Sequence, residues 1–208
     1  MDRMRVGIAL YNAGRYLAAR EPLEERWLGS PAGERGECLR GLVQASAAVY
    51  NSRGGNEPGA PDLAESAPDL AESASGHLDG CEVIDVDALG GWLDRLAADP
   101  TLGEREEPPE IRLDGPETVG PEAIGVYDLT PEGVVAAAEA VAGTTDDDLL
   151  RAAAGYAESA LDDGDESSPF VTLTLDYVRD PTPIVRQRLR EHVGRRRTRT
   201  ADVEGLFE

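Results

Sequence analysis

Residues 6–27, VGIALYNAGRYLAAREPLEERW, decide the fold of this chain because they hold two apolar patterns separated by a turn. Apolar side chains recur on both sides of the turn at the mixed spacings of three and four residues that are typical of helices. They are Val6, Ile8, Leu10 and Tyr11 before it, and Tyr16, Leu17, Leu23 and Trp27 after it. Asn12-Ala13-Gly14 supplies the helix stop between them. We therefore predict two helices joined by a tight turn.

A third helix is predicted over residues 34–51, with one apolar side and a glycine-containing end at Arg53-Gly54-Gly55. The sequence Ala9-Leu10-Tyr11-Asn12 returns as Ala48-Val49-Tyr50-Asn51, and each copy precedes a turn. A repeat of this length is typical of stacked helical hairpins. We expect an all-α fold of stacked antiparallel hairpins, either tetratricopeptide-like or a bundle, with a helical C-terminal extension.

A seven-residue segment is duplicated, since residues 60–66 and 67–73 both read APDLAES. The spacing places Leu63 and Leu70 on one helical face, but Pro61 and Pro68 repeat too, and a proline inside a helix costs about 3 kcal/mol. We predict a kinked or broken helix here. We interpret the duplication as a recent insertion rather than a functional heptad, because one repeat unit cannot define a coiled coil.

The rest of the chain divides at a segment without apolar periodicity. Asp85 or Asp87 is expected to cap a helix that ends the first domain, residues 1–97. Residues 98–122 are rich in Pro, Gly and Glu and are interpreted as an acidic linker, with some extended structure near residues 111–113. Residues 123–208 form the predicted helical extension.

Start signals for helices recur in this extension, where a Thr or Ser precedes a proline. They occur at Thr130-Pro131, Ser168-Pro169 and Thr182-Pro183, and Thr145 or Asp146 is expected to open a further helix. Residues 171–175 alternate as a strand would, but the chain offers few partner strands, so we predict a helix there as well.

The charge of the chain is strongly negative. The sequence holds 20 arginines, no lysine and 41 acidic residues, which gives a net charge of −21. Concentrated salt screens the self-repulsion of such a surface. We therefore expect a soluble cytoplasmic protein from a salt-adapted cell, of haloarchaeal type. No apolar run is long enough to span a membrane, and the first residues do not resemble a signal segment.

Two segments escape the acidic bias. Residues 1–55 have a net charge of +2 and residues 186–208 of +3, against −26 for the residues between them. The last segment contains the nucleic-acid candidates Arg195, Arg196, Arg197 and Arg199. We expect these arginines to neutralise carboxylates of the same chain instead, because phosphate contacts weaken steeply as salt rises.

Few residues of the chain are typical of catalysis. Cys38 and Cys81 are interpreted as small core residues, and His77 and His192 as surface residues. The sequence shows no catalytic triad, phosphate loop or dinucleotide fingerprint. We expect no metal and no cofactor.

Four motifs resemble a known family: Tyr11-Asn12-Ala13-Gly14-Arg15-Tyr16, residues 19–27 (AREPLEERW), Gly41-Leu42-Val43-Gln44 and residues 54–60 (GGNEPGA). As an ordered set they resemble the family described as domain of unknown function 309, over about the first 95 residues. The resemblance implies a small all-helical fold and no particular activity. Relatives in that family usually carry histidine where this chain has Arg20, and often another near Asn51, so an imidazole site is not expected here.

The candidate site is a polar cluster on the second and third helices. Glu21 and Glu24 share a helical face, and carboxylates so placed can act as acid and base or hold a metal. The proposed binding residues are Arg20, Glu21, Glu24, Trp27, Gln44, Tyr50 and Asn56. The other interpretation is a buried network that locks these two helices together.

Three functions follow, in this order. The first is a non-enzymatic scaffold or adaptor that uses a groove between helices, with another protein as its partner. The alternative is a carboxylate- or metal-assisted, hydrolase-like enzyme built around Glu21 and Glu24. Nucleic-acid binding through the C-terminal arginines ranks third, and neither nucleic acid nor a membrane is the expected partner.

Overall fold

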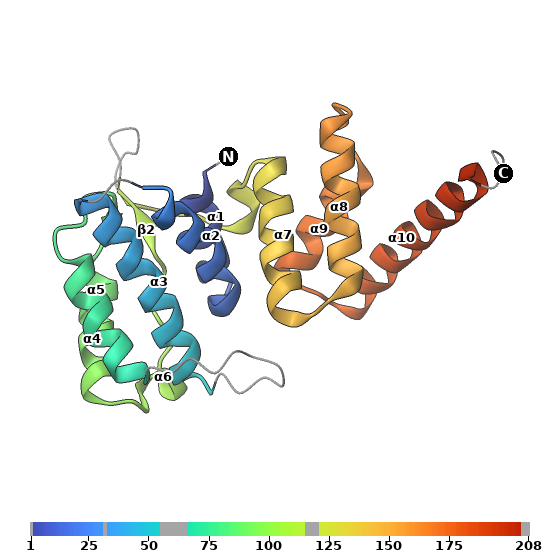
Figure 1. Ribbon diagram of the computed structural model, residues 1–208. Coiled ribbons are helices and arrows are strands. Elements are labelled where there is room, and N and C mark those ends of the chain that lie inside the picture. The colour runs from blue at the N-terminus through green and yellow to red at the C-terminus, as the bar shows by residue number, and fades with distance from the viewer. Residues whose placement is uncertain (1, 31–32, 55–65, 115–120, 205–208) are drawn as a thin grey trace. The chain divides into compact units, whose positions relative to one another are not determined.

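The computed structural model describes residues 2–30, 33–54, 66–114 and 121–204. The chain forms two compact units, an N-terminal unit, Asp2–Asp128, and a C-terminal unit, Leu129–Glu208. Most of the described residues are helical, which confirms the predicted fold class (Figure 1). The division falls later in the chain than the boundary predicted near residue 97.

Consecutive helices of the N-terminal unit pack against one another. They are α1 (Arg3–Asn12), α2 (Tyr16–Leu28), α3 (Glu34–Ser52), α4 (Ala67–Leu78) and α5 (Asp87–Ala98). The turn between α1 and α2 forms as predicted, because Gly14 adopts a φ of 73° that other residues rarely take. The packed helix pairs confirm the predicted hairpins.

Glycine allows the closest of these helix contacts. A Cβ atom added at Gly41 on α3 would lie 2.8 Å from Cγ of Leu78 on α4, and one added at Gly7 on α1 would overlap Leu23 on α2. Both leucines are fully buried or nearly so. The missing side chains therefore set how closely the helices approach.

The described part of residues 98–122 belongs to the N-terminal unit rather than separating two domains. It holds α6 (Leu102–Arg105) and β2 (Arg112–Leu113), which confirms the predicted extended structure near residue 111. Strand β2 pairs antiparallel with β1 (Ile84–Asp85) on one side and with β3 (Glu122–Ala123) on the other. The short helix η1 (Val126–Asp128) follows and packs against α1. The sequence did not predict this sheet.

Asn12, the last residue of α1, holds this extended segment in place. Its side-chain amide donates to the backbone carbonyls of Ile111 and Ile124, each at 2.9 Å, and its carbonyl accepts from the backbone N–H of Ile111 at 2.8 Å. Ile111 is fully buried. The side chain of Asn12 thus satisfies backbone groups that would otherwise lack partners in the unit's interior.

Cys38 and Cys81 are both buried, as their interpretation as small core residues expects, but they also form a disulfide that the sequence did not predict. Cys38 lies on α3 and Cys81 follows α4, and the packing of these helices brings their Cα atoms to 5.3 Å although 43 positions separate them in the sequence. That separation fits neither a compact disulfide scaffold nor a metal motif, which explains why the sequence did not reveal the bond.

The described residues of the C-terminal unit, 129–204, form four helices: α7 (Pro131–Thr145), α8 (Asp148–Asp162), α9 (Pro169–Arg179) and α10 (Pro183–Glu204). The predicted caps are confirmed for Thr130 and Ser168, whose side chains accept backbone N–H bonds at the starts of α7 and α9. Helix α8 is capped by Asp147, one residue beyond the predicted choice. Residues 171–175 are helical, as predicted.

The second copy of the duplicated segment begins α4. Ser66 caps the helix by accepting a hydrogen bond from the backbone N–H of Asp69, and Pro68 lies in the first turn. A first-turn proline loses no helical hydrogen bond, so α4 is not kinked at Pro68. The helix begins only at Ala67, after the extended residue Ser66, which agrees with the other prediction, a broken helix. Pro61 and Leu63 lie outside the described residues.

Within the described ranges, every helix is too short or too polar to cross a lipid bilayer.

Candidate functional site

The two carboxylates predicted to act together on α2 have different surroundings: Glu24 forms an ion pair, and Glu21 faces solvent. Nη2 of Arg20 donates to Oε1 of Glu24 at 2.7 Å, with the side chain of Arg20 24% exposed and that of Glu24 39% exposed. Glu21 is exposed. Arg20 therefore neutralises one carboxylate on the helix that carries it, which is the structural role weighed for it in the sequence.

The other predicted residues of this site contact different neighbours. The ring of Trp27 is partly buried, and the guanidinium carbon of Arg40 lies 6.0 Å from its centroid. Oε1 of Gln44 accepts a hydrogen bond from Ser73 on α4 at 3.0 Å. Tyr50 is partly buried in the last turn of α3, and Asn56 lies outside the described residues.

The histidines are both partly buried, although the sequence suggested surface positions. Nδ1 of His77 lies 2.6 Å from a carboxylate oxygen of Glu37, which links α4 to α3. His192 lies on α10 in the C-terminal unit. In the part of the chain that the structure describes, no group of three or more His, Cys, Asp or Glu side chains is placed to hold a metal ion.

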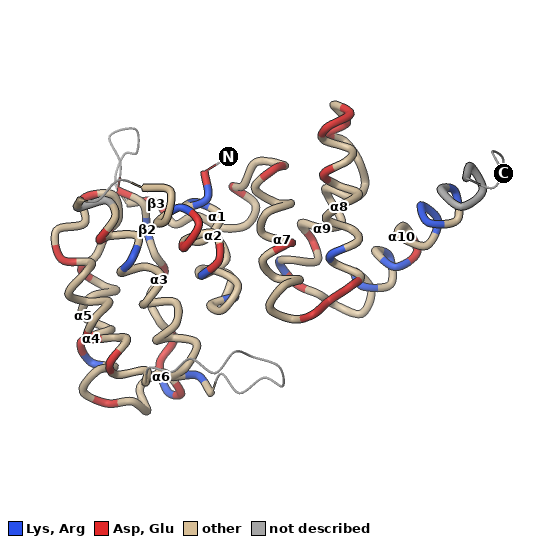
Figure 2. The backbone as a smooth tube through the Cα atoms, viewed as in Figure 1, with Lys and Arg blue, Asp and Glu red and all other residues tan. Residues whose placement is uncertain are grey.

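The seven arginines of α10 are exposed, and they cover much of the length of this helix (Figure 2). They are Arg186, Arg188, Arg190, Arg195, Arg196, Arg197 and Arg199. Arg186 meets the expectation of an internal ion pair, since its Nη2 lies 3.4 Å from Oδ2 of Asp147. Burial against acidic segments does not account for the seven as a group.

A cavity of about 530 Å³ lies between α8, the start of α9 and α10. Three of the four nucleic-acid candidates, Arg195, Arg196 and Arg199, line it together with His192. Arg197 is exposed and is not part of its lining. Side chains three or four positions apart share one face of a helix, so α10 presents these four groups to the same space.

Aromatic rings form another part of this cavity. The centroids of Tyr156 on α8 and Phe170 on α9 are 5.1 Å apart, and the ring of His192 meets Phe170 edge-on at 6.2 Å. The guanidinium of Arg196 lies 5.8 Å from the centroid of Tyr156. Phe170 also packs against the buried cluster of Val135, Ala157 and Val171. The aromatic side of the cavity is therefore anchored in the unit's core.

Carboxylates and a hydroxyl complete the lining, since Asp163, Asp165 and Ser168 come from the loop between α8 and α9. Ser168 is buried, and its Oγ caps α9 by accepting from the backbone N–H of Phe170 at 3.4 Å. We call the whole space, bounded by arginines, rings and these carboxylates, the α8–α10 groove.

Asp147 joins the helices that bound the groove. Its carboxylate accepts hydrogen bonds from the backbone N–H groups of Leu149 and Leu150 and from the hydroxyl of Tyr177, and it pairs with Arg186. Burial alone would raise the pKa of Asp147, but the bond from Tyr177, the bonds from the backbone and the nearby guanidinium together lower it below its ordinary value.

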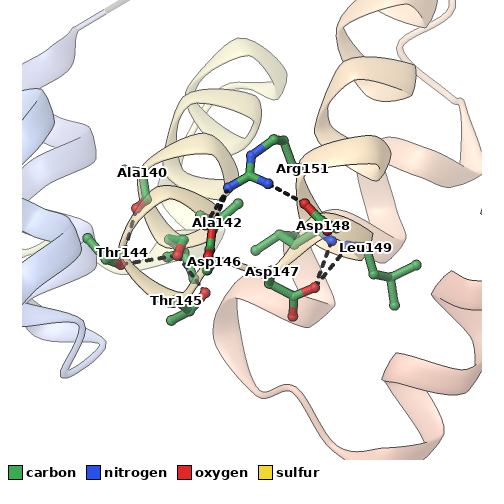
Figure 3. A network of polar contacts seen from close by, with 11 residues as sticks. Ala140, Ala142, Thr144, Thr145, Asp146, Asp147, Asp148, Leu149 and Arg151 are labelled. Carbon is green, nitrogen blue, oxygen red and sulfur yellow. Dashed lines mark hydrogen bonds and ion pairs between the residues drawn. The ribbon is translucent and has the colours of Figure 1, made fainter. Parts of the chain in front are cut away.

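The turn that leads into α8 is held by Arg151 (Figure 3). Its guanidinium pairs with Asp148 at 2.5 Å and donates to the backbone carbonyl of Ala142 on α7 at 3.3 Å. Asp146, in the left-handed conformation with a φ of 53°, lies 3.4 Å from the same group. These contacts hold the turn from which Asp147 caps α8.

The N-terminal unit carries a second cavity of about 390 Å³ between α4 and α5. Asp79, Asp87 and Asp94 line it, along with small residues. It is acidic and holds neither an arginine nor an aromatic ring. The α8–α10 groove is therefore the cavity with the wider range of binding chemistry.

Sequence reasoning identified the arginines of the groove but not their partners. The charge map singled out residues 186–208, whereas Tyr156 and Phe170 were apparent only as members of helical patterns. A signal was available in retrospect, because Tyr156 interrupts an otherwise small-residue face on α8. The sequence contains no comparable signal for the disulfide or for the contacts of Asn12.

Comparison with known proteins bears on the N-terminal unit. No curated protein matches the chain, and no solved structure does. Residues 4–63, which include α1, α2 and α3, match the family described as Domain of unknown function (DUF309). The start of the N-terminal unit is therefore a DUF309 domain, over residues 4–63.

Proposed function

We propose that this protein is a non-enzymatic binding protein, an adaptor whose ligand-binding surface is the α8–α10 groove. The observation that carries the proposal is the cavity of about 530 Å³, in which guanidinium groups, aromatic rings and carboxylates converge from three helices. Ligand sites are typically concave and combine apolar surface with a few polar groups. The DUF309 domain then acts as the folded platform to which this binding unit is joined.

The groove is built to hold a ligand in one orientation. Tyr156 and Phe170 are partly buried, so their positions are fixed by packing while part of each ring stays accessible. The network around Asp147 holds the three helices that carry the lining. Binding to such a preorganised surface loses little conformational entropy.

The enzyme built around Glu21 and Glu24 remains a prediction with less support. An acid-base pair needs two carboxylates in one accessible cleft, and here Glu24 pairs with Arg20 while Glu21 lies at the surface. This arrangement favours a structural role for the cluster.

Salt adaptation and a cytoplasmic location belong to the same proposal. The net charge of −21 and the absence of lysine support a protein that works in concentrated salt. The Cys38–Cys81 disulfide counts against the cytoplasm, where such bonds are rare. Counting free thiols in protein taken directly from its native cells would decide between the compartments.

The proposed function is tested by calorimetric titration of the full chain with three ligand classes: single-stranded oligonucleotides, duplex DNA and acidic peptides. We expect one class to bind the wild type, to bind the double variant Arg195→Gln/Arg199→Gln much more weakly, and to be recovered chemically unchanged. Equal binding of every class by both proteins, or a ligand recovered cleaved, would overturn the proposal.

A further inference from the structure

The arginines of the groove are arranged to contact a chain of negative charges. Arg195 and Arg199 are one helical turn apart on α10, and both are exposed where they line the cavity. A turn of helix separates them by about 6 Å, which is close to the distance between neighbouring phosphates of an extended strand. Guanidinium groups bind phosphate through paired hydrogen bonds.

The aromatic rings of the groove offer a stacking surface, which the phosphates of a ligand would not contact but its bases could. Tyr156 and Phe170 lie 5.1 Å apart with their planes at 47°, so they form a bent aromatic surface beside the arginines. Nucleobases stack on surfaces of this kind in proteins that bind single strands. A duplex keeps its bases stacked within the helix, and only an unpaired base reaches a ring inside a cavity.

The carboxylates of the groove favour nucleic acid over an acidic peptide as its ligand. Asp163 and Asp165 would repel the carboxylates of such a peptide, whose ionised side chains carry only hydrogen-bond acceptors. Bases carry amino groups, and carboxylates accept hydrogen bonds from them, as with N4 of cytosine. The same two residues thus disfavour one polyanion and can contact the bases of the other.

Resting on the proposed function, we infer that the α8–α10 groove binds single-stranded nucleic acid, with phosphates on Arg195 and Arg199 and a base against Tyr156 and Phe170. The stacking contact depends less on salt than the phosphate contacts do. Binding in concentrated salt therefore relies on the rings.

The test measures fluorescence anisotropy of labelled strands, RNA and DNA, of about 12 nucleotides, within the range of known single-strand sites. The full chain is titrated over a series of KCl concentrations. Arg195→Gln/Arg199→Gln removes two charges from the groove. Arg188→Gln/Arg190→Gln is the matched control, because it removes the same charge from exposed positions of the same helix that do not line the cavity.

We expect the groove variant to bind at least about tenfold more weakly and to lower the slope of log affinity against log salt by about 1.4, as two lost phosphate contacts on a single strand would. The control variant should keep its affinity within about threefold, as for charges outside the site. Equal losses in the two variants would mean diffuse attraction to α10 and would overturn the inference.

Tyr156→Leu tests the ring without changing the charge. It should weaken binding by about tenfold, an effect that persists at high salt, since base stacking contributes this much per base. Circular dichroism checks that the variant is folded. An unchanged affinity for Tyr156→Leu, equal affinity for duplex DNA, or displacement of the strand by micromolar mononucleotide would each overturn the inference. If acidic peptides bind instead, with the same loss in the groove variant, the adaptor function stands and this inference fails.

Discussion

The hydroxyl of Tyr177 donates a hydrogen bond of 2.5 Å to the carboxylate of Asp147, which joins α9 to the N-cap of α8. Tyr177 is buried, and the side chain of Asp147 is only 10% exposed. Tyr177→Phe removes the hydroxyl and keeps the ring, so we expect a loss of about 1 to 3 kcal/mol in the free energy of unfolding of the C-terminal unit. Urea denaturation followed by circular dichroism measures it, and a loss near zero would show that this bond does not hold the helices together.

The same pair predicts how stability depends on pH. The pKa of Asp147 is lowered in the folded state, so its stabilising effect is fully present above the ordinary carboxylate pKa of about 3.9 and is lost as the pH falls through the lowered value. Tyr177→Phe weakens this dependence. Denaturation at a series of pH values should show the wild type and the variant converging in stability under acid conditions, whereas a constant difference would contradict this assignment.

The disulfide predicts a dependence on reducing agents. Cys38 and Cys81 are 43 positions apart in the sequence. Reducing a disulfide that closes a loop of this length lowers the free energy of unfolding by about 2 to 4 kcal/mol, because the unfolded chain gains conformational freedom. Denaturation with and without dithiothreitol measures the loss. Cys38→Ala/Cys81→Ala is the control, because its stability should not respond to the reductant; if the wild type does not respond either, the bond contributes nothing.

Two glycines of the N-terminal unit should respond oppositely to alanine. Gly41→Ala forces a methyl group against Leu78 and should destabilise the unit by about 1 to 3 kcal/mol. Gly76 on α4 has open space around it, so Gly76→Ala should stabilise by up to about 1 kcal/mol through helix propensity. Thermal unfolding of both variants compares them. Similar shifts of the midpoint for both would show that the α3–α4 contact is not as close as described.

Asn12 should contribute measurably to stability, because its side chain makes three hydrogen bonds to distant backbone groups. Asn12→Ala removes three hydrogen bonds to the backbone of Ile111 and Ile124 and should cost about 2 to 4 kcal/mol. Asn12→Asp keeps one acceptor but places a negative charge beside two carbonyls, so it should rescue little. Hydrogen exchange at the backbone N–H of Ile111 reports the contact directly; protection equal to that of the wild type in Asn12→Ala would exclude it.

The sequence predicted most where local signals agree. The helices that follow Thr130 and Ser168 begin where a capping residue precedes proline, because cap chemistry acts within a few residues. The helix over residues 171–175 required an argument from the scarcity of partner strands, and that argument was right. Capping residues, apolar periodicity and composition are all local signals. They predict where helices form, but they do not predict which residues pack against those helices.

The contacts that escaped prediction join distant parts of the chain. The sequence predicts Asn12 only as part of a turn. The fold brings its side chain into contact with Ile111, 99 positions away. The groove is a similar case, since the arginines stand out by charge whereas Tyr156 does not. A ring that lines a cavity and a ring that fills a core have the same helical spacing, so periodicity alone cannot separate them.

The duplicated segment has a consequence for how this chain acquired its present form. Ser66, the residue that caps α4, is the last residue of the first copy, and the residue that precedes that copy is Gly59. An ancestor with a single copy would have begun the same helix after glycine. Serine and glycine differ by only a few tenths of a kcal/mol at this position. If the duplication is an insertion, as we interpret it, the change from glycine to serine at this cap would be nearly neutral for the helix, while Ser66 supplies the side-chain cap that α4 has now.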